Sequence, residues 1–257
     1  MPIKPRFRLF GGPNGSGKTH VFTDFREKGI IHTEIYVNAD RIEADLKRGR
    51  KFNFNAYRVR VDDASFKKHI FNSGLFESKI KDKSFISKFS IRAGVLRINT
   101  DVKINSYHAS FVASYLADRL FQTKQSFAFE TVMSHESKVE LLNLAGQNGY
   151  KTYFYFIFAD NISTNIARVK LRVLRGGHDV EESTILARAP RTFRLLPSAF
   201  EAADSSYVID NSQDAVTILA KEGNTITRSS TFPSIINGAI QEILRKLDKS
   251  FTIKTRK

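Results

Sequence analysis

Apolar and polar positions follow two periods along this chain, one typical of strands and one typical of helices. Apolar runs at residues 7–10, 126–130, 150–158 and 206–210 predict strands, and "HTEIYVNAD" (32–40) predicts another that ends at Asp40. Apolar residues spaced three and four apart predict helices from about Lys18 to Phe25 and at residues 109–121, 137–149, 163–177 and 234–247. This alternation predicts an α/β fold in three layers, with a mostly parallel sheet and helices on both faces.

A long stretch without clear periodicity, residues 49–104, interrupts this alternation after the second strand. We predict one domain over residues 1–257, with this stretch as a basic, aromatic-rich insertion. The net charge is +15, and residues 47–103 hold 15 basic residues against 5 acidic ones. They form either a solvated basic face or a surface that attracts a polyanionic substrate or an acidic partner. Phe52, Phe54 and Tyr57 either stack on nucleic-acid bases or pack the insertion.

Composition excludes several classes of protein. At 257 residues and 41% apolar content the chain can bury a large core, and it has no cysteine for disulfides or thiolate metal sites. No apolar run reaches the roughly 18 residues of a membrane span. The start, Met1 to Lys4, lacks the apolar stretch of a secretory signal. We therefore expect a cytoplasmic protein without membrane contact.

The segment "GGPNGSGKT" contains the phosphate-binding pattern G-x-x-x-x-G-K-[ST] between a predicted strand and a predicted helix. Glycines let backbone N–H groups approach phosphate oxygens, the lysine reaches the β and γ phosphates, and the threonine hydroxyl binds Mg²⁺. We predict that ATP or GTP binds here, with Thr19 on the metal. The predicted nucleotide-binding residues are Gly12, Pro13, Asn14, Gly15, Ser16, Gly17, Lys18 and Thr19.

Three acidic or hydroxyl residues follow the predicted strands at the rim where ligands bind in such folds. Asp40 is placed to accept the proton of a phosphoryl acceptor, or it caps the helix that begins at Arg41. Glu130 and Thr131 end another strand and could bind sugar or nucleoside hydroxyls, or cap a loop. The sequence alone leaves both pairs of alternatives open.

Two rows of arginines flank "GGHDV". Arg168, Arg172 and Arg175 share one helical face, and Arg188, Arg191 and Arg194 follow the glycines. Because positioned cations stabilise phosphoryl transfer, residues 163–198 are predicted to form a lid over the γ-phosphate, the alternative being a structural helical hairpin. No predicted strand ends in the Asp-Glu pair of motor-like ATPases, which favours a kinase.

Four features together resemble the zeta-toxin family of P-loop kinases. They are the E-T in "FETVMS" after a strand, the segment "RVKLRVLRGGHDV", the "RAPR" that follows it, and the "DNS" after the last predicted strand. The resemblance covers residues 5–48 and about 106–212. The chain departs from the family at Ala189, where an aromatic residue is usual, and in residues 49–104, which the smallest members lack.

The resemblance implies a kinase that uses Mg²⁺ with ATP or GTP and phosphorylates a hydroxyl of a small acceptor, such as the nucleotide-sugar UDP-N-acetylglucosamine. It also implies a possible small acidic antitoxin. By motif, Lys18 and Thr19 match the phosphate-loop pair and Asp40 the general base. Glu130 and Thr131 match the family's acceptor-binding positions, and Arg188 and Arg191 are further candidates for that role. Arg172, with its neighbours Arg168 and Arg175, matches the cations of the family's lid. The competing hypothesis is a nucleic-acid-binding protein or a polynucleotide-end kinase, which we rank lower.

Overall fold

A computed structural model describes residues 4–246 and 251–256. The chain divides into two compact units: residues 1–36 with 126–257, called the sheet unit below, and residues 37–125, called the middle unit. Leu247, the last residue of the predicted closing helix, and Met1 to Ile3 lie outside the described residues. No described helix has the length and apolar character needed to cross a membrane.

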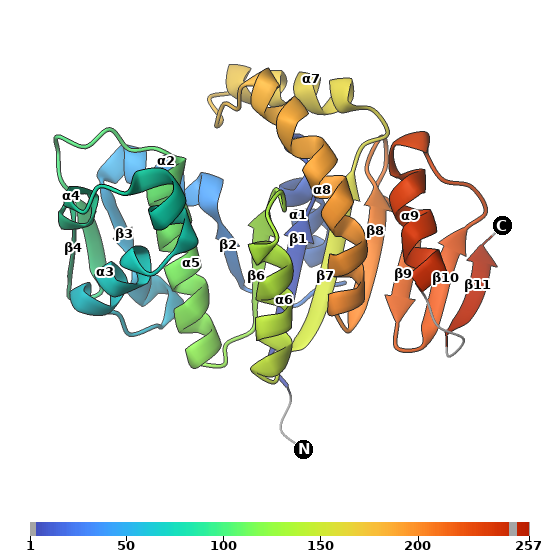
Figure 1. Ribbon diagram of the computed structural model, residues 1–257, viewed down its shortest axis with the longest axis horizontal. Coiled ribbons are helices and arrows are strands. Elements are labelled where there is room, and N and C mark those ends of the chain that lie inside the picture. Colours follow the sequence, from blue (N-terminus) through green and yellow to red (C-terminus); the bar gives the residue numbers. More distant parts are fainter. Residues whose placement is uncertain (1–3, 247–250, 257) are drawn as a thin grey trace. The chain divides into compact units, whose positions relative to one another are not determined.

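An eight-stranded sheet organises the first of these units (Figure 1). Its strand order is β11-β10-β9-β8-β7-β1-β6-β2, and β1 pairs in parallel with β6 and β7, as β7 does with β8. Only β9 runs antiparallel to its neighbours β8 and β10 among the pairings described. The strands are β1 (Arg6–Gly11), β2 (Ile35–Asn38), β6 (Phe127–Thr131), β7 (Lys151–Phe158), β8 (Ser205–Asp210), β9 (Val216–Glu222), β10 (Thr225–Ser229) and β11 (Thr252–Arg256).

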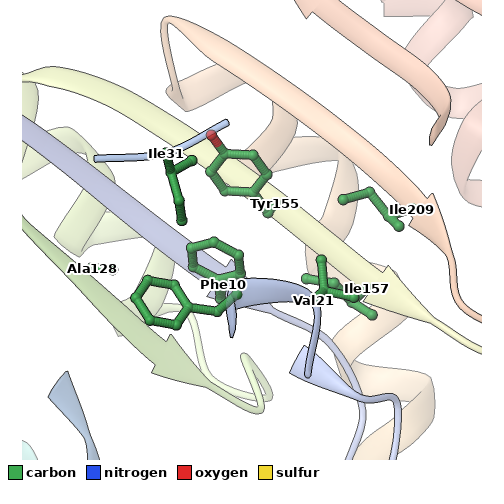
Figure 2. Close-up of a cluster of buried hydrophobic side chains, with 8 residues drawn as sticks. Phe10, Val21, Ile31, Ala128, Tyr155, Ile157 and Ile209 are labelled. Carbon is green, nitrogen blue, oxygen red and sulfur yellow. The ribbon is translucent and has the colours of Figure 1, made fainter. Parts of the chain in front are cut away.

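Helices cover both faces of this sheet. Side chains alternate along β7, and Tyr155 and Ile157 pack with Phe10 and with Val21 of α1 in the cluster of Figure 2. Phe156 points to the opposite face, where its ring meets Phe193 of α8. The helices of the sheet unit are α1 (Lys18–Glu27), α6 (Ser137–Gln147), α7 (Ile162–Leu174), α8 (Glu182–Ala202) and α9 (Ser234–Lys246). The predicted fold class, a mostly parallel α/β sheet, is confirmed.

The strand after α1 is shorter than its apolar pattern predicts. β2 ends at Asn38, and the following residues already belong to helix α2 (Ala39–Gly49). The Asn38 side chain accepts hydrogen bonds from the backbone N–H groups of Asp40 and Arg41, so Asn38 caps this helix. Both the strand end at Asp40 and the alternative that Asp40 is the helix cap are therefore wrong.

The middle unit has its own core and a small antiparallel sheet of order β3-β5-β4. Phe52 and Phe54 are buried, and the Phe54 ring contacts Phe66 and Tyr115 edge to face. Their packing role is thereby confirmed, and neither ring is available to stack on a base. The elements after α2 are β3 (Lys51–Asn53), η1 (Phe54–Tyr57), α3 (Asp63–Phe71), η2 (Phe76–Ile80), α4 (Ser84–Ser87), β4 (Phe89–Arg92), β5 (Val95–Ile98) and α5 (Ser106–Gln122).

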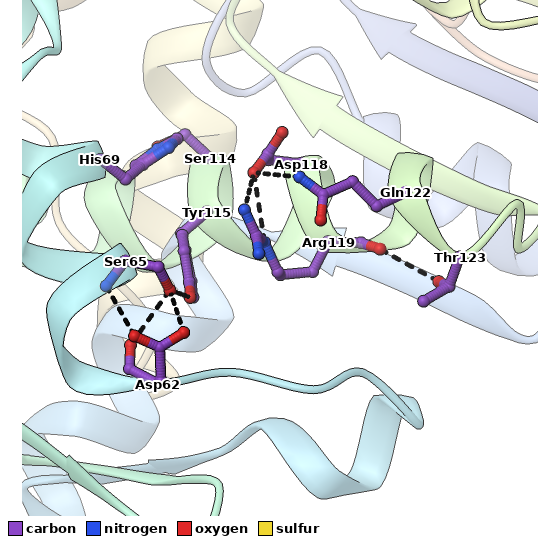
Figure 3. A network of polar contacts seen from close by, with 9 residues as sticks. All are labelled: Asp62, Ser65, His69, Ser114, Tyr115, Asp118, Arg119, Gln122 and Thr123. Carbon is purple, nitrogen blue, oxygen red and sulfur yellow. Dashed lines mark hydrogen bonds and ion pairs between the residues drawn. The ribbon is translucent and has the colours of Figure 1, made fainter.

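Polar contacts join α3 to α5 within the middle unit (Figure 3). The Ser65 hydroxyl lies 2.7 Å from Asp62 Oδ2 and 2.5 Å from the Tyr115 hydroxyl, and His69 Nε2 lies 2.9 Å from Ser114 Oγ. Since each of these groups finds a partner inside the unit, the network fixes how the two helices pack.

Candidate active site

The phosphate-binding loop, residues 12–19, connects β1 to α1 and needs its glycines. Gly12 and Gly15 have φ angles of 146° and 77°, which side chains disfavour. A Cβ atom on Gly12 would lie 1.9 Å from the Ile157 carbonyl oxygen, and one on Gly15 would lie 2.2 Å from the Asn165 carbonyl oxygen. The loop is thus pressed between β7 and α7, and only glycine fits at these contacts.

The loop ends at a helix terminus whose backbone N–H groups have no side-chain cap. Gly17 is the N-cap of α1 and makes no side-chain hydrogen bond, and the first turn holds no acidic residue. Lys18 is buried, and its Nζ donates to the carbonyl oxygens of Gly12 (3.0 Å) and Pro13 (2.8 Å). Open N–H groups, the positive helix end and a lysine arched over the loop make a site for an anion.

Two polar side chains of the loop have unused hydrogen-bonding capacity. Asn14 and Ser16 are buried, and neither the Asn14 Oδ1 nor the Ser16 Oγ has a partner among the described residues. Buried polar atoms normally find partners in a folded protein, so an unmet pair at one turn points to a ligand there. A hydroxyl such as that of Ser16 can donate to a phosphate oxygen.

Glu130, at the end of β6, lies against the hydroxyl of Thr19. Thr19 Oγ1 donates to Glu130 Oε2 at 2.7 Å, and the Tyr36 hydroxyl donates to the same oxygen. Burial raises the pKa of the Glu130 carboxyl, while the charge of Lys18, the Thr19 hydrogen bond and the charge of Arg172 oppose that rise. The predicted acceptor-binding role of Glu130 stays a prediction, as does the predicted metal-binding role of the Thr19 hydroxyl that it contacts.

Thr131, the other acceptor-binding candidate on this strand, is half-buried, and its Oγ1 accepts a hydrogen bond from the Met133 N–H at 3.3 Å. Asp40 lies in the first turn of α2 and belongs to the middle unit. Its predicted role as general base therefore rests on its sequence position and on the family resemblance.

The arginines of α7 have different surroundings. Arg168 Nη2 donates to the Ser212 carbonyl at 2.9 Å, and the charge of Arg172 opposes the rise that burial causes in the Glu130 pKa. Arg175 ends the helix in an exposed position. Of the three arginines, Arg172 is the one whose charge acts on Glu130, whereas Arg168 is bonded to the Ser212 carbonyl and Arg175 is exposed.

Residues 163–198 form a hairpin of two helices, α7 and α8, whose connection contains Gly176 and Gly177. On α8, Arg188 is half-buried and Arg191 is exposed, with its Nε donating to the Ala187 carbonyl. Ala189, where the family usually has an aromatic residue, is buried. The lid function of this hairpin stays a prediction.

Sequence reasoning missed three residues at this rim. Tyr36 holds Glu130, Asn165 contacts the loop through its backbone, and the Asn211 side chain bonds the Ser16 carbonyl. The signal for Asn211 was present in the "DNS" motif, to which no role was given. Tyr36 and Asn165 carried no comparable signal.

Comparisons with known proteins bear on the fold. No family model matches the chain. An uncharacterised protein of Haemophilus influenzae is 31% identical over 70 residues, which are 26% of this chain and 50% of that protein. A chain of the AvrRxo1-ORF1:AvrRxo1-ORF2 crystal structure with ATP superposes with a TM-score of 0.54 at 11% identity, over 96% of this chain and 66% of that one. The native form of the complex gives 0.55 at 12%, over 94% and 64%.

A further solved chain, from the PezAT chromosomal toxin-antitoxin system of Streptococcus pneumoniae, is 12% identical with a TM-score of 0.45, over 83% of this chain and 70% of that one. The present chain thus spans half of the curated relative and less than two thirds of the AvrRxo1 chains. At these identities the similarity establishes the fold. This chain shares the α/β fold of the AvrRxo1 chains, in agreement with the mostly parallel α/β sheet that its sequence predicts.

Proposed function

We propose that this protein is a nucleoside-triphosphate-dependent kinase that phosphorylates a hydroxyl of a small acceptor. The observation that carries the proposal is the loop of residues 12–19, which combines glycine contacts, an open helix terminus and the buried Lys18. A structural turn would need none of these features together. The AvrRxo1 complex of the same fold was crystallised with ATP, which supports a nucleotide as the ligand.

Mg²⁺ fits beside the loop. The Thr19 hydroxyl and the Glu130 carboxylate are hard oxygen donors that already contact each other at 2.7 Å, and Mg²⁺ prefers such donors together with phosphate oxygens. When bound, the ion neutralises charge that develops on the transferred phosphoryl group. Tyr36, which donates to Glu130, would keep the carboxylate aimed at Thr19.

The remaining roles follow from position and chemistry. Lys18 would leave the loop carbonyls and pair with the β and γ phosphates, and Arg172 would meet the γ-phosphate from α7. Asp40 would accept the proton of the acceptor hydroxyl. Thr131, Arg188 and Arg191 are the candidates for acceptor binding, with a nucleotide-sugar as the acceptor that the family resemblance favours. A protein partner is supported by the AvrRxo1-ORF2 subunit in the related complex, and the family resemblance implies that it is an acidic antitoxin.

Lys18→Ala tests the proposal. We expect this variant to lose ATP turnover, measured with candidate acceptors such as UDP-N-acetylglucosamine, while its thermal unfolding stays cooperative. Lys28→Ala, on the exposed end of α1, is the matched control and should keep wild-type turnover. Full turnover in Lys18→Ala would rule out the kinase. Sub-micromolar, steeply salt-dependent binding of an oligonucleotide at about 150 mM salt would favour the polynucleotide alternative instead.

A further inference from the structure

The turn Asp210-Asn211-Ser212 follows β8 and is fixed by its own side chains. Asp210 Oδ1 accepts hydrogen bonds from the Ser212 backbone N–H at 2.9 Å and from the Ser212 hydroxyl at 2.5 Å. The backbone N–H of Asn211 donates to the Phe158 carbonyl at 2.8 Å, which ties the turn to the end of β7. These bonds leave the Asn211 side chain with one defined direction.

That direction is toward the phosphate-binding loop. Asn211 is buried, and its Nδ2 donates to the Ser16 carbonyl at 2.8 Å across 195 residues of sequence. A Cβ atom on Gly17 would lie only 2.2 Å from the same nitrogen, so the amide sits directly against the loop backbone. The Asn211 amide thus occupies the space that a side chain at residue 17 would need.

The hydrogen bond from Asn211 to the Ser16 carbonyl also affects the neighbouring Gly17 N–H group, because both belong to one peptide bond. The Ser16 carbonyl and the Gly17 N–H belong to one planar unit and point in opposite directions. Gly17, with φ of 88°, could allow this unit to rotate, because glycine has little steric restriction. Anchoring the Ser16 oxygen therefore fixes the direction of the Gly17 N–H, which is one of the donors that an anion in the loop would use.

Ser212 connects the same turn to the arginine helix α7. Its carbonyl accepts a hydrogen bond from Arg168 Nη2 at 2.9 Å, and its hydroxyl accepts one from the Asp160 N–H, also at 2.9 Å. The turn thus contacts the loop through one residue and α7 through the next. Arg168 is thus held by a backbone carbonyl of this turn.

We propose that Asn211 is a positioning residue, which holds the Ser16–Gly17 peptide in its anion-binding orientation. Together with Ser212, it fixes the position of the loop relative to α7. The inference rests on the proposed nucleotide-binding function and assigns a role to the "DNS" motif. It concerns the diphosphate part of the nucleotide, because the Gly17 N–H lies in the loop that would hold the phosphates.

The test compares ADP with AMP as titrants of the full chain, without added metal. Asn211→Ala removes the anchor without adding charge, and Asn224→Ala, an exposed position in the β9–β10 turn, is the control. We expect the ADP to AMP affinity ratio to fall about tenfold or more in Asn211→Ala, as for a lost buried hydrogen bond, and to be unchanged in Asn224→Ala. An unchanged ratio in folded Asn211→Ala would overturn the inference. If the wild type itself binds neither nucleotide, the proposed function fails first.

A measurement on the wild type covers the case in which Asn211→Ala does not fold. We expect the side-chain NH₂ protons of Asn211 to exchange with solvent much more slowly than those of exposed Asn224 in nucleotide-free protein. Asn211→Asp, which keeps the size but loses the donor, identifies the resonance. Exchange of the Asn211 amide at the rate of Asn224 would contradict a locked loop.

Discussion

The two units of this chain use their polar side chains in opposite ways. In the described sheet unit, the buried side-chain atoms without a hydrogen-bond partner include two of the loop, on Asn14 and Ser16, and one on Asn165, whose backbone contacts the loop; others lie on Arg8 and Arg168. In the described middle unit, the corresponding atom is His108 Nε2 alone. Unmet hydrogen-bonding groups in the loop are what a ligand there can complete.

The excess of positive charge is found mainly in the middle unit. The middle unit holds 18 basic residues against 9 acidic ones, and it places basic side chains on the exposed face of its small sheet. Lys51 stands directly opposite Arg97 there, and Arg92 stands opposite Val95 on the same face. The described structure gives these three side chains no acidic partner. The loop of the sheet unit thus contains polar atoms without hydrogen-bond partners among the described residues, whereas the middle unit has an excess of positive charge on its surface.

The largest effect is expected where the loop backbone is closest to β7. Gly12→Ala puts a Cβ atom 1.9 Å from the Ile157 carbonyl at a φ of 146°, and it should cost about 3 kcal/mol or more of unfolding free energy. Urea denaturation measures this cost. The control Gly146→Ala, in α6 with nothing within 4 Å, should instead stabilise by about 0.5–1 kcal/mol. Equal effects at both glycines would mean that the loop is not under this constraint.

Asp40→Asn tests whether the middle unit is only a scaffold. If Asp40 is the general base, the substitution should lower kcat by roughly 10²–10⁴ and leave nucleotide Kd unchanged. Asp45→Asn, an exposed residue further along α2, should change neither quantity. Steady-state kinetics with ATP titrations give both values. A parallel loss of nucleotide affinity would assign Asp40 to a metal or structural role.

A smaller effect, with a defined pH dependence, is expected at Glu130. Burial holds its folded pKa above the ordinary 4.5, so the folded state binds this proton more tightly than the unfolded state. Stability should therefore fall as pH rises from 4.5 through the raised pKa. Glu130→Gln lacks this loss and should therefore gain stability relative to the wild type as pH rises from acidic to neutral. Chemical denaturation across pH measures this gain, and a pH-independent difference would contradict the assignment.

The smallest effect concerns the surface charge of the middle unit. Arg97→Glu converts the like-charge pair with Lys51 into an opposite-charge pair, and it should stabilise the protein by about 0.5 kcal/mol at low salt. Arg92→Glu makes the same change of charge opposite Val95 and should gain less. If both variants gain equally, net charge rather than strand pairing determines the stability.

Much of the sheet unit is predictable because its central strands are buried on both faces. Such strands are continuous apolar runs, as "FYFIF" in β7 is, and they stand out from their surroundings. The outer strands were missed for the converse reason. β10 and β11, Thr225–Ser229 and Thr252–Arg256, mix polar and apolar residues and carry no such run. Helix α8 was implied only by the alternative of a helical hairpin over residues 163–198, because it contains Pro190 and Pro197, which normally end helices.

The site was predictable only where a local pattern fixes the chemistry. The loop from Gly12 to Thr19 is one continuous motif, whereas the contact between Thr19 and Glu130 depends on β6 being the neighbour of β1. Strand order is set by tertiary packing, which periodicity does not encode. Residues 49–104 of the middle unit, with strands of three and four residues, gave no readable pattern, whereas the helix at residues 109–121 was predicted.

The close approach of Gly15 to Asn165 means that a shift of the loop would press on helix α7 near its N-terminal end. Leu174, the last residue of α7, lies nine positions after Asn165. It is therefore about 13 Å along the helix axis from the point where the helix contacts the loop. A tilt of about 10° around that point, triggered by a shift of the loop, would carry the tip by about 2 Å. Leu174 is 84% exposed, and the sequence contains no cysteine. A single thiol introduced at residue 174 would therefore carry a spectroscopic label at the exposed end of α7, where a tilt of the helix would be detected.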